Sequence, residues 1–279
     1  MEDFRDKIVV ITGASSGMGL AYVEEFAYLG ARLAICDIDG DVLGVVAAEA
    51  AKLVGEENVY AERVDVSDRG AVFAFAKTVR ERLGPADVVL NNAGIGGQGT
   101  PFYHADLDDF ERVLHVNLHG VVYVAKAFLP QLVERGAGAL VNVSSAFGLV
   151  APPNVTDYVS AKFAVRGFTE SLMAEFLDSP IQIHSLHPGG VDTAIAGDLP
   201  ADEFATRFLT TPPNEIARYV IASIRKGRRQ IVCGHQGRRL WVAARILSPV
   251  QFARQFWRES KGMADSSRYG DFNAGLVGR

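Results

Sequence analysis

The sequence predicts an α/β fold, with a doubly wound sheet of seven parallel strands, helices on both faces and a helical extension at the carboxyl end. Two observations support this prediction. Short, β-branched apolar runs of the buried-strand type alternate with amphipathic helical patterns, as is typical of a parallel sheet. The 279 residues are an ordinary length for one α/β domain and show no repeat or interdomain linker. We therefore expect one domain over residues 1–237 and an extension over 238–279 that is not an independent domain.

The individual elements follow from apolar runs, helical periodicity and glycine stops. The first run, Lys7–Ile11, leads into a glycine-rich turn and then a helix that ends at Gly30. Later runs are separated by helical stretches in the same way. The expected strands cover residues 7–11, 31–36, 58–64, 86–91, 138–144, 181–187 and 230–233. The expected helices cover residues 17–29, 41–54, 69–82, 107–134, 157–178 and 213–226.

The turn Thr12–Gly19 has the spacing Gly-x-x-x-Gly-x-Gly at Gly13, Gly17 and Gly19. Backbone amides at the start of the following helix can hold a pyrophosphate, and the helix dipole favours the negative charge. Glycine is needed where a side chain would block that approach. The spacing differs from the common Gly-x-Gly-x-x-Gly pattern. The turn therefore predicts a dinucleotide site, with a purely structural turn as the alternative.

Asp37 follows the second expected strand and lies 18 residues after Gly19. An acidic residue about 20 residues beyond such a turn binds the ribose 2′-hydroxyl of NAD. A carboxylate there repels a 2′-phosphate, and neither the glycine turn nor residues 38–40 contain an Arg or Lys. The sequence therefore favours NAD(H) over NADP(H). Two alternatives remain open: Asp37 caps a turn, or Asp39 or Asp41 takes its place.

Tyr158 and Lys162 are four positions apart, and Tyr158 lies thirteen residues after Ser145. On a helix, positions i and i+4 share a face, so the phenol and the ammonium can lie side by side. A tyrosine with its ordinary pKa near 10 is a poor base, and a nearby positive charge lowers that pKa. The pair therefore predicts a tyrosine that exchanges protons near neutral pH. A partly exposed aromatic residue beside a solvated lysine is the alternative.

Six motifs occur in an order that resembles the short-chain dehydrogenase/reductase family, from about Lys7 to about Gly234. The resemblance implies a Rossmann fold and an enzyme that acts on a CH–OH group with NAD or NADP as acceptor. The motifs are Thr12-Gly13-x-x-x-Gly17-x-Gly19, Asp65 in Arg63-Val64-Asp65-Val66, Asn91-Asn92-Ala93-Gly94, Asn117, Ser145 with Tyr158 and Lys162, and Pro188-Gly189-Gly190-Val191-Asp192-Thr193.

By this resemblance, the catalytic tetrad is Asn117, Ser145, Tyr158 and Lys162. Tyr158 transfers the proton, and Lys162 lowers the tyrosine pKa and binds the nicotinamide ribose. Ser145 donates to the developing alkoxide, and Asn117 holds a water. Ser144 is a rival to Ser145, with a backbone hydrogen bond as its other role. The implied cofactor-binding residues are Gly13, Ser15, Ser16, Gly17, Met18, Gly19, Asp37, Ile38, Asp65, Val66, Asn92, Ala93, Gly94, Tyr158, Lys162, Pro188, Gly189, Val191 and Thr193.

In this family the segment after the last motif covers the substrate, so residues 193–213 are expected to form a lid. The lid and the neighbours of the tetrad are rich in apolar side chains, which favours a lipid-like substrate of the hydroxyacyl, ketoacyl, sterol or retinoid type. Alternatively, these apolar side chains only pack the lid against the core. Alternatives are a small diol or acetoin-type dehydrogenase and a non-catalytic nucleotide-binding regulatory protein. The residues concerned are Ile95, Phe102, Phe147, Leu149, Val150, Ile195, Leu199, Phe204, Phe208 and Leu209.

Hydrophobic residues make up 48% of the chain and charged residues 22%, the balance of a soluble globular protein. The charged start, Met1–Asp6, predicts no signal peptide, and no apolar run reaches the 18 residues typical of a membrane span. Cys36 and Cys233 fall in expected strands, as in a reduced cytoplasmic protein. His115 and His119 share a helix face without a third ligand, so no metal site is expected.

The family resemblance implies a homodimer or homotetramer formed through the helices over 107–134 and 157–178. No nucleic-acid partner is expected. The segment 216–258 contains ten Lys and Arg residues and no Asp or Glu, whereas the whole chain carries a net charge of −5. Apolar residues interleave with these charges around Pro249, which predicts two short basic amphipathic helices. A subunit contact with solvated arginines on the outside explains these helices, and an anionic membrane surface, an acidic carrier protein and a coenzyme A phosphate are the alternatives.

Overall fold

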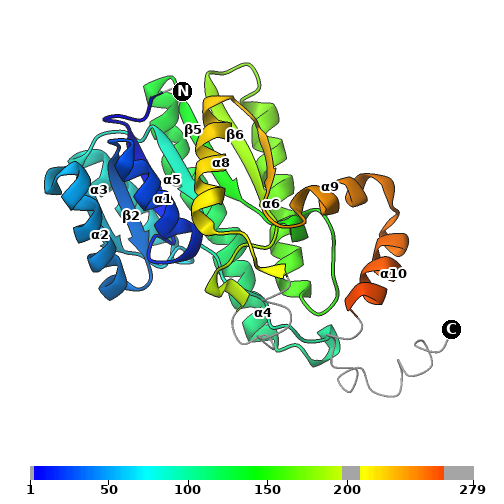
Figure 1. Cartoon of the computed structure of the whole chain (residues 1–279). Helices are drawn as coiled ribbons and strands as arrows, with labels where there is room; N and C mark the ends of the chain where they lie inside the picture. The colour runs from blue at the N-terminus through cyan, green and yellow to red at the C-terminus, as the bar shows by residue number, and fades with distance from the viewer. Residues whose placement is uncertain (1–2, 197–207, 261–279) are drawn as a thin grey trace.

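The structure, a computed structural model, describes residues 3–196 and 208–260 (Figure 1). Within these residues the chain forms one sheet of seven strands in the order β3-β2-β1-β4-β5-β6-β7. Every neighbouring pair is parallel, which confirms the predicted fold class. The strands are β1 (Ile8–Thr12), β2 (Arg32–Asp37), β3 (Val59–Arg63), β4 (Val88–Asn91), β5 (Gly138–Val143), β6 (Ile181–Pro188) and β7 (Gln230–Cys233).

Helices cover both faces of the sheet, and each face has its own buried apolar cluster. Successive side chains of a strand point to opposite faces, so Val9 and Ile11 join the cluster under α1, α2 and α8, while Ile8 and Val10 join the cluster under α3, α5 and α6. The helices are α1 (Gly17–Tyr28), α2 (Gly40–Val54), α3 (Arg69–Arg82), α4 (Leu107–Leu114), α5 (Gly120–Arg135), α6 (Thr156–Glu175), α8 (Pro213–Arg225), α9 (Gly237–Ile246) and α10 (Pro249–Ser260).

The single helix expected over 107–134 is divided in the structure. A π-helical turn, His115–His119, lies between α4 and α5. In such a turn the backbone bonds run from residue i to i+5, so the helix widens locally and its side chains rotate relative to a regular helix. The buried Asn117 lies in the middle of this turn. The irregularity therefore sets the direction of one of the predicted catalytic side chains.

Of the helices that the structure describes, one stretch, Leu107–Arg135, is long and apolar enough to cross a membrane, with a mean hydropathy of 1.2. Within the fold, however, α5 packs against α3, β4 and β5. Core helices of soluble proteins pass the same test of length and composition. We therefore assign this stretch to the core of the α/β fold.

The extension forms the two predicted helices, and Pro249 begins the second of them. Figure 1 shows α9 and α10 projecting from the body of the molecule on the side of α6. Helix α9 contacts β7 and the 3₁₀ turn Ala146–Gly148, which follows β5. The extension thus begins beside the carboxyl ends of the strands.

His184 lies in β6 and is fully buried. Its Nδ1 lies 2.7 Å from the Arg228 carbonyl oxygen and its Nε2 lies 3.1 Å from Gln182 Oε1. Burial lowers the pKa of His184 to about 4, from an ordinary value near 6.5. Between these two pH values the unfolded chain binds more protons than the folded chain, so the free energy of unfolding decreases as the pH falls from 6.5 towards 4.

We predict that His184→Gln makes the thermal stability less dependent on pH in this window, because glutamine keeps hydrogen-bonding groups but does not titrate. The slope of the unfolding free energy below pH 6.5 decreases by up to about 1.4 kcal/mol per pH unit. Thermal melts of both proteins between pH 7.5 and pH 4.5, in buffers of one ionic strength, measure this slope. Parallel curves for wild type and variant contradict the assignment.

Candidate functional site

The carboxyl ends of the parallel strands meet at one edge of the sheet, and the glycine turn joins that edge at β1. Thr12 Oγ1 accepts hydrogen bonds from the amides of Asn92 and Ala93, both at 3.0 Å. Asn92 Nδ2 donates to the carbonyl oxygens of Thr12 (3.0 Å) and Gly13 (3.3 Å). The chain leaves β1 for one face of the sheet and β4 for the other, which is where open α/β sheets bind ligands. These bonds therefore hold the ends of β1 and β4 together at the place where a ligand would bind.

The glycine turn has the form of a phosphate cradle. Gly13 and Gly17 have φ angles of 67° and 52°, which favour glycine. A Cβ atom at Gly13 would lie 2.8 Å from Ala93 Cα. Ser16 makes no side-chain cap at the start of α1, so the first amides of this helix can bind an anion. The buried Oδ1 of Asn92 has no hydrogen-bond partner among the described residues. The turn therefore fits the pyrophosphate of a dinucleotide.

Asp37 ties the glycine turn to the end of β2. Its carboxylate accepts the Ser15 amide at 2.9 Å and the Asp39 amide at 3.1 Å. Each carboxylate oxygen has a second lone pair, so the group can still accept from ribose hydroxyls. Asp39 instead caps α2 by accepting from the Val42 amide. Of the acidic residues considered for the ribose, the structure thus favours Asp37 over Asp39.

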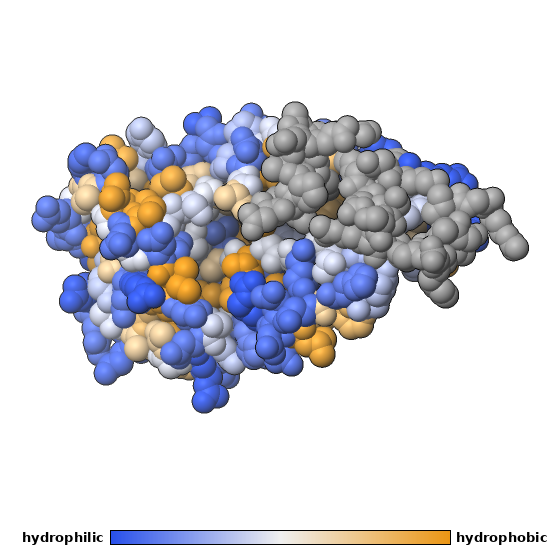
Figure 2. Space-filling view, turned by 90° about the horizontal axis from the view of Figure 1, so that it is seen from below, coloured by the Kyte–Doolittle hydropathy of each residue, from blue (hydrophilic) through white to orange (hydrophobic). Residues whose placement is uncertain are grey.

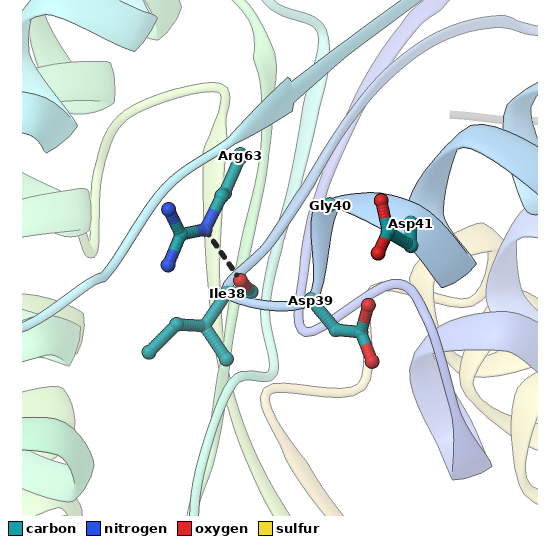
Figure 3. A pocket seen from close by; sticks show the side chains of 5 residues that line it. All are labelled: Ile38, Asp39, Gly40, Asp41 and Arg63. Atoms are coloured by element: carbon teal, nitrogen blue, oxygen red, sulfur yellow. Dashed lines mark hydrogen bonds between the residues drawn. The ribbon is translucent and has the colours of Figure 1, made fainter.

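A pocket of about 480 Å³ lies just beyond the end of β2 and is lined by Ile38, Asp39, Gly40, Asp41 and Arg63 (Figure 3). Arg63 Nε donates to the Ile38 carbonyl oxygen at 2.9 Å. Figure 3 shows the guanidinium and the Ile38 side chain on one side of the backbone, and the two carboxylates on the other. The pocket therefore combines an apolar side chain with charged groups of both signs.

Arg63 lies outside the glycine turn and residues 38–40, so the local sequence around Asp37 does not reveal this basic residue. The register of the sheet pairs Arg63 with Asp37 across β3 and β2. Both residues end their strands, so parallel pairing of consecutive strands was the signal that could have placed them together.

The remaining predicted cofactor residues lie around the same edge. Asp65 Oδ1 accepts from the Ser67 amide and hydroxyl, and Val66 packs against Gly120 at the start of α5. At the far side of the turn, a Cβ atom on Gly17 would lie 2.9 Å from Thr193 Cγ2. The turn that begins at Pro188 is held next to β7, since the Gly189 amide donates to the Cys233 carbonyl oxygen at 2.7 Å. The segment 188–193 thus borders the glycine turn, and Val191 is buried beneath it.

Asn117 and Lys162 meet at Gly94, where a Cβ atom would lie 2.9 Å from Asn117 Oδ1 and 3.4 Å from Lys162 Nζ. Asn117 binds the Ile95 peptide from both ends, with Oδ1 accepting its amide and Nδ2 donating to its carbonyl oxygen, each at 2.8 Å. The loop after β4 is thereby pinned to the π turn.

Ser145 lies beside Tyr158, and the two side chains share a hydrogen bond. Ser145 Oγ accepts the Phe147 amide at 3.0 Å, which leaves the hydroxyl hydrogen available for donation. The neighbouring Ser144 donates instead to the Lys162 carbonyl oxygen at 2.8 Å. Ser144 thus makes the backbone hydrogen bond considered for it, and Ser145 faces the tyrosine.

Burial sets the charge states of Tyr158 and Lys162. It raises the pKa of Tyr158 above its ordinary value of 10, while the hydrogen bond with Ser145 acts in the opposite direction. Burial also lowers the pKa of Lys162 to about 8. Lys162 Nζ donates to the Val143 carbonyl oxygen at 3.1 Å and lies 5.5 Å from the centre of the Tyr158 ring. Burial therefore opposes the expected lowering of the tyrosine pKa by Lys162, because it disfavours the charged forms of both side chains.

Asp157 is a second residue to which the sequence pattern gave no role. It is only 3% exposed, and its Oδ2 accepts the Gln98 amide at 2.9 Å. A Cβ atom at Gly97 would overlap this carboxylate. Asp157 thus anchors the loop after β4 to the start of α6. Aspartate in the first turn of a helix is ordinary, so the sequence held no signal for this contact.

The apolar side chains expected around the substrate differ in burial. Leu149 and Val150 are buried, Phe102 is 56% exposed, and the backbone of Ile195 lies against Gly96 above the site. Ile95, Phe147, Phe208 and Leu209 are half-buried. Leu199 and Phe204 lie outside the described residues, as does most of the expected lid. His115 and His119 meet edge to face with ring centres 5.0 Å apart, and no metal-ligand cluster of three or more occurs among the described residues.

Comparisons with known proteins agree with this geometry. A family model described as short chain dehydrogenase matches residues 7–203. The protein SadH of Mycobacterium tuberculosis is 38% identical over 259 residues, covering 88% of this chain and 93% of that protein. The cis-4-hydroxycyclohexanecarboxylate dehydrogenase of Sinomonas cyclohexanicum is 34% identical, covering 78% of this chain and 86% of that enzyme.

Solved structures show the same fold. A short-chain dehydrogenase/reductase from Burkholderia phymatum in complex with NAD superposes with a TM-score of 0.80 at 28% identity, covering 88% of this chain and 94% of the other. An alcohol dehydrogenase from Thermococcus sibiricus complexed with 5-hydroxy-NADP has a TM-score of 0.72 at 33% identity, covering 81% and 93%. The family model and these relatives show that the chain belongs to the short-chain dehydrogenase/reductase family of oxidoreductases that act on CH–OH groups.

Proposed function

We propose that the protein is a cytoplasmic, NAD(H)-dependent enzyme that interconverts a secondary alcohol and a ketone on an apolar, lipid-like substrate. The observation that carries the proposal is the meeting of Tyr158, Ser145, Lys162 and Asn117 at the sheet edge where β1 and β4 diverge. This arrangement places a proton donor, a hydroxyl donor and a cation in one buried site.

Each member of the tetrad has a distinct task. NAD supplies the hydride acceptor or donor when it is bound, and the protein orients the reactants. Tyr158 gives its phenolic proton to the carbonyl oxygen in reduction and takes it back in oxidation. Ser145 donates its hydroxyl hydrogen to the same oxygen and stabilises the negative charge that develops there. Lys162, with a pKa of about 8, can exchange a proton near neutral pH and offsets the charge of the phenolate.

Asn117 acts on Lys162 through the loop after β4. Its amide holds the Ile95 peptide, and Gly94 lies against both side chains. We place at this point the water that connects Lys162 with solvent and returns a proton after each turnover. The absence of a Cβ atom at Gly94 leaves the space between the two side chains open for that water.

The surroundings of the tetrad support an apolar substrate. Leu149 and Val150 are buried next to the Ser145 turn, while Phe102, Tyr103 and Leu107 are 56, 60 and 63% exposed before and at the start of α4. Figure 2 views the molecule from below and shows groups of hydrophobic residues separated by hydrophilic ones on this face. The relative from Sinomonas cyclohexanicum is named for a ring alcohol, so cyclic secondary alcohols belong in the first substrate panel.

We predict that Tyr158→Phe lowers kcat by roughly a hundredfold to ten-thousandfold, because the general acid is lost. NADH binding stays within about twofold, since the ring remains. The assay follows NADH oxidation with ketones graded by size and polarity, and NADH affinity is measured by fluorescence. Tyr28→Phe, at a tyrosine that is 75% exposed on α1, serves as the matched control and keeps full activity. Unchanged turnover in Tyr158→Phe contradicts the mechanism, and no wild-type turnover despite NADH binding favours a non-catalytic role.

The proposed preference for NAD(H) rests on Asp37, with Arg63 as the opposing charge. We predict that NADH binds roughly tenfold to a hundredfold more tightly than NADPH, because the carboxylate repels a 2′-phosphate. Asp37→Asn decreases the ratio of the NADH affinity to the NADPH affinity. Arg63→Gln increases this ratio and leaves the NADH affinity nearly unchanged. Titration calorimetry of the wild type and both variants with each nucleotide measures all six dissociation constants. If the wild type binds NADPH more tightly than NADH, the proposed preference is wrong, and the positive charge of Arg63 outweighs the negative charge of Asp37.

We further propose that the protein is a homodimer or homotetramer through α5 and α6, where Val133 and Phe163 are 54% and 38% exposed. The basic extension is proposed to contact an anionic membrane surface. Val242, Ile246 and Val250 are 44, 73 and 59% exposed on α9 and α10. Exposed arginines lie on the same helix faces, at positions 238, 254 and 258. Aliphatic side chains flanked by arginines are typical of helices that lie on anionic lipid.

We predict that replacing Arg238, Arg254 and Arg258 together by Gln weakens binding to phosphatidylglycerol vesicles roughly a hundredfold, since each charge contributes about 1 kcal/mol near such a surface. The matched control replaces Lys52, Arg69 and Lys77, which are exposed basic residues on α2 and α3. Cosedimentation at low and high salt measures the affinity. Equal binding by both triple variants contradicts the membrane contact, and a change in oligomer size in light scattering assigns the surface to a subunit contact instead.

A further inference from the structure

His187 lies at the carboxyl end of β6, fully buried and directly behind Ser145. Its Nδ1 lies 3.1 Å from the Ser145 carbonyl oxygen, and its Nε2 lies 2.8 Å from Ser185 Oγ. A carbonyl oxygen can only accept, so Nδ1 carries the proton, and Nε2 then accepts the hydrogen of the Ser185 hydroxyl. The two contacts therefore select one tautomer of a neutral ring.

The charge state of His187 is set by its surroundings. Arg166 and Glu170 of α6 are the charged groups that act on the ring, in opposite directions, and they form an ion pair with each other at 2.8 Å. Burial is the largest influence and lowers the pKa of His187 to about 4. The ring is therefore neutral at physiological pH and keeps its single Nδ1 hydrogen for the Ser145 carbonyl.

Ser145 needs such a contact because the ladder of the sheet ends just before it. The last bond across to β6 runs from the Ser144 amide to the Leu186 carbonyl oxygen at 2.8 Å. Beyond it, the Ser145 carbonyl oxygen accepts the Gly148 amide at 2.9 Å, a bond within its own turn. His187 is thus the side chain that ties the Ser145 peptide back to the sheet.

We propose that His187 is a positioning residue that holds the Ser145 peptide in place, so that the Ser145 hydroxyl reaches Tyr158 and the substrate oxygen. The proposal rests on the proposed function in so far as Ser145 acts on substrate. A displacement of about 1 Å at a reacting group costs on the order of a hundredfold in rate. If Ser145 moves because its contact with His187 is lost, the hydrogen bond between Ser145 and Tyr158, which lowers the pKa of Tyr158, is lost as well.

Two isosteric variants separate this role from simple packing. In His187→Asn the amide nitrogen takes the place of Nδ1 and can donate to the Ser145 carbonyl. In His187→Gln the amide reaches the place of Nε2, towards Ser185, and the Ser145 carbonyl loses its donor. His187→Leu removes both contacts. If His187→Leu does not fold, Ser185→Ala replaces it, because it keeps the ring and removes the bond that selects the tautomer.

We predict that kcat falls roughly tenfold to a hundredfold in His187→Gln and His187→Leu, and stays within about threefold of wild type in His187→Asn. NADH affinity is unchanged in all three. The midpoint of tyrosinate absorbance assigned to Tyr158, by difference from Tyr158→Phe, moves to higher pH in the first two variants and not in His187→Asn. Equal kcat values in all variants overturn the proposal. So does a fall in kcat that follows only the fall in melting temperature, while the midpoint of the tyrosinate titration stays in place.

The tyrosinate titration needs no substrate, which separates this inference from the proposed function. If the wild type turns over no ketone but the midpoint moves in His187→Gln and not in His187→Asn, the proposed activity fails and the positioning role stands. If the wild type is active and the midpoint stays in place in every variant, the positioning role fails alone.

Discussion

The hydrogen bonds between Thr12 and the Asn92–Ala93 backbone are the constraint on which the rest of the site depends. They join β1 to β4 at the point where the chain leaves the sheet towards opposite faces. Gly13 meets Ala93 so closely that no side chain fits between them. The glycine turn is therefore held against the loop that carries Gly94 and Ile95, and Gly94 in turn lies against Asn117 and Lys162.

Burial of the ionisable side chains in the site lowers the stability of the fold. Burial of Lys162 and Tyr158 disfavours the charged form of each, and the fold compensates with backbone contacts such as the bond from Lys162 to the Val143 carbonyl oxygen. The same burial brings the pKa of the lysine close to neutral pH, where proton exchange is most effective. Asp157 shows the same principle, since a buried carboxylate is used to hold the loop over the tyrosine.

Much of the fold was predictable because each strand is a short β-branched run between clear breaks, and the predicted and observed strands agree closely. The π turn at His115–His119 was not, because the apolar periodicity continues through it. Arg63 required the register of β2 and β3, which no local pattern contains. The spacing places Lys162 beside Tyr158 but does not tell how deeply the pair is buried, and this burial raises the pKa of Tyr158.

A crystal structure of the protein with NADH tests the central claim most directly, namely that one sheet edge assembles a dinucleotide site and a proton-transfer site. The account predicts the pyrophosphate at the amino end of α1, the adenine ribose at Asp37 and the nicotinamide between Tyr158 and Thr193. A nucleotide bound with its ribose away from Asp37, or with its nicotinamide away from Tyr158, contradicts the account.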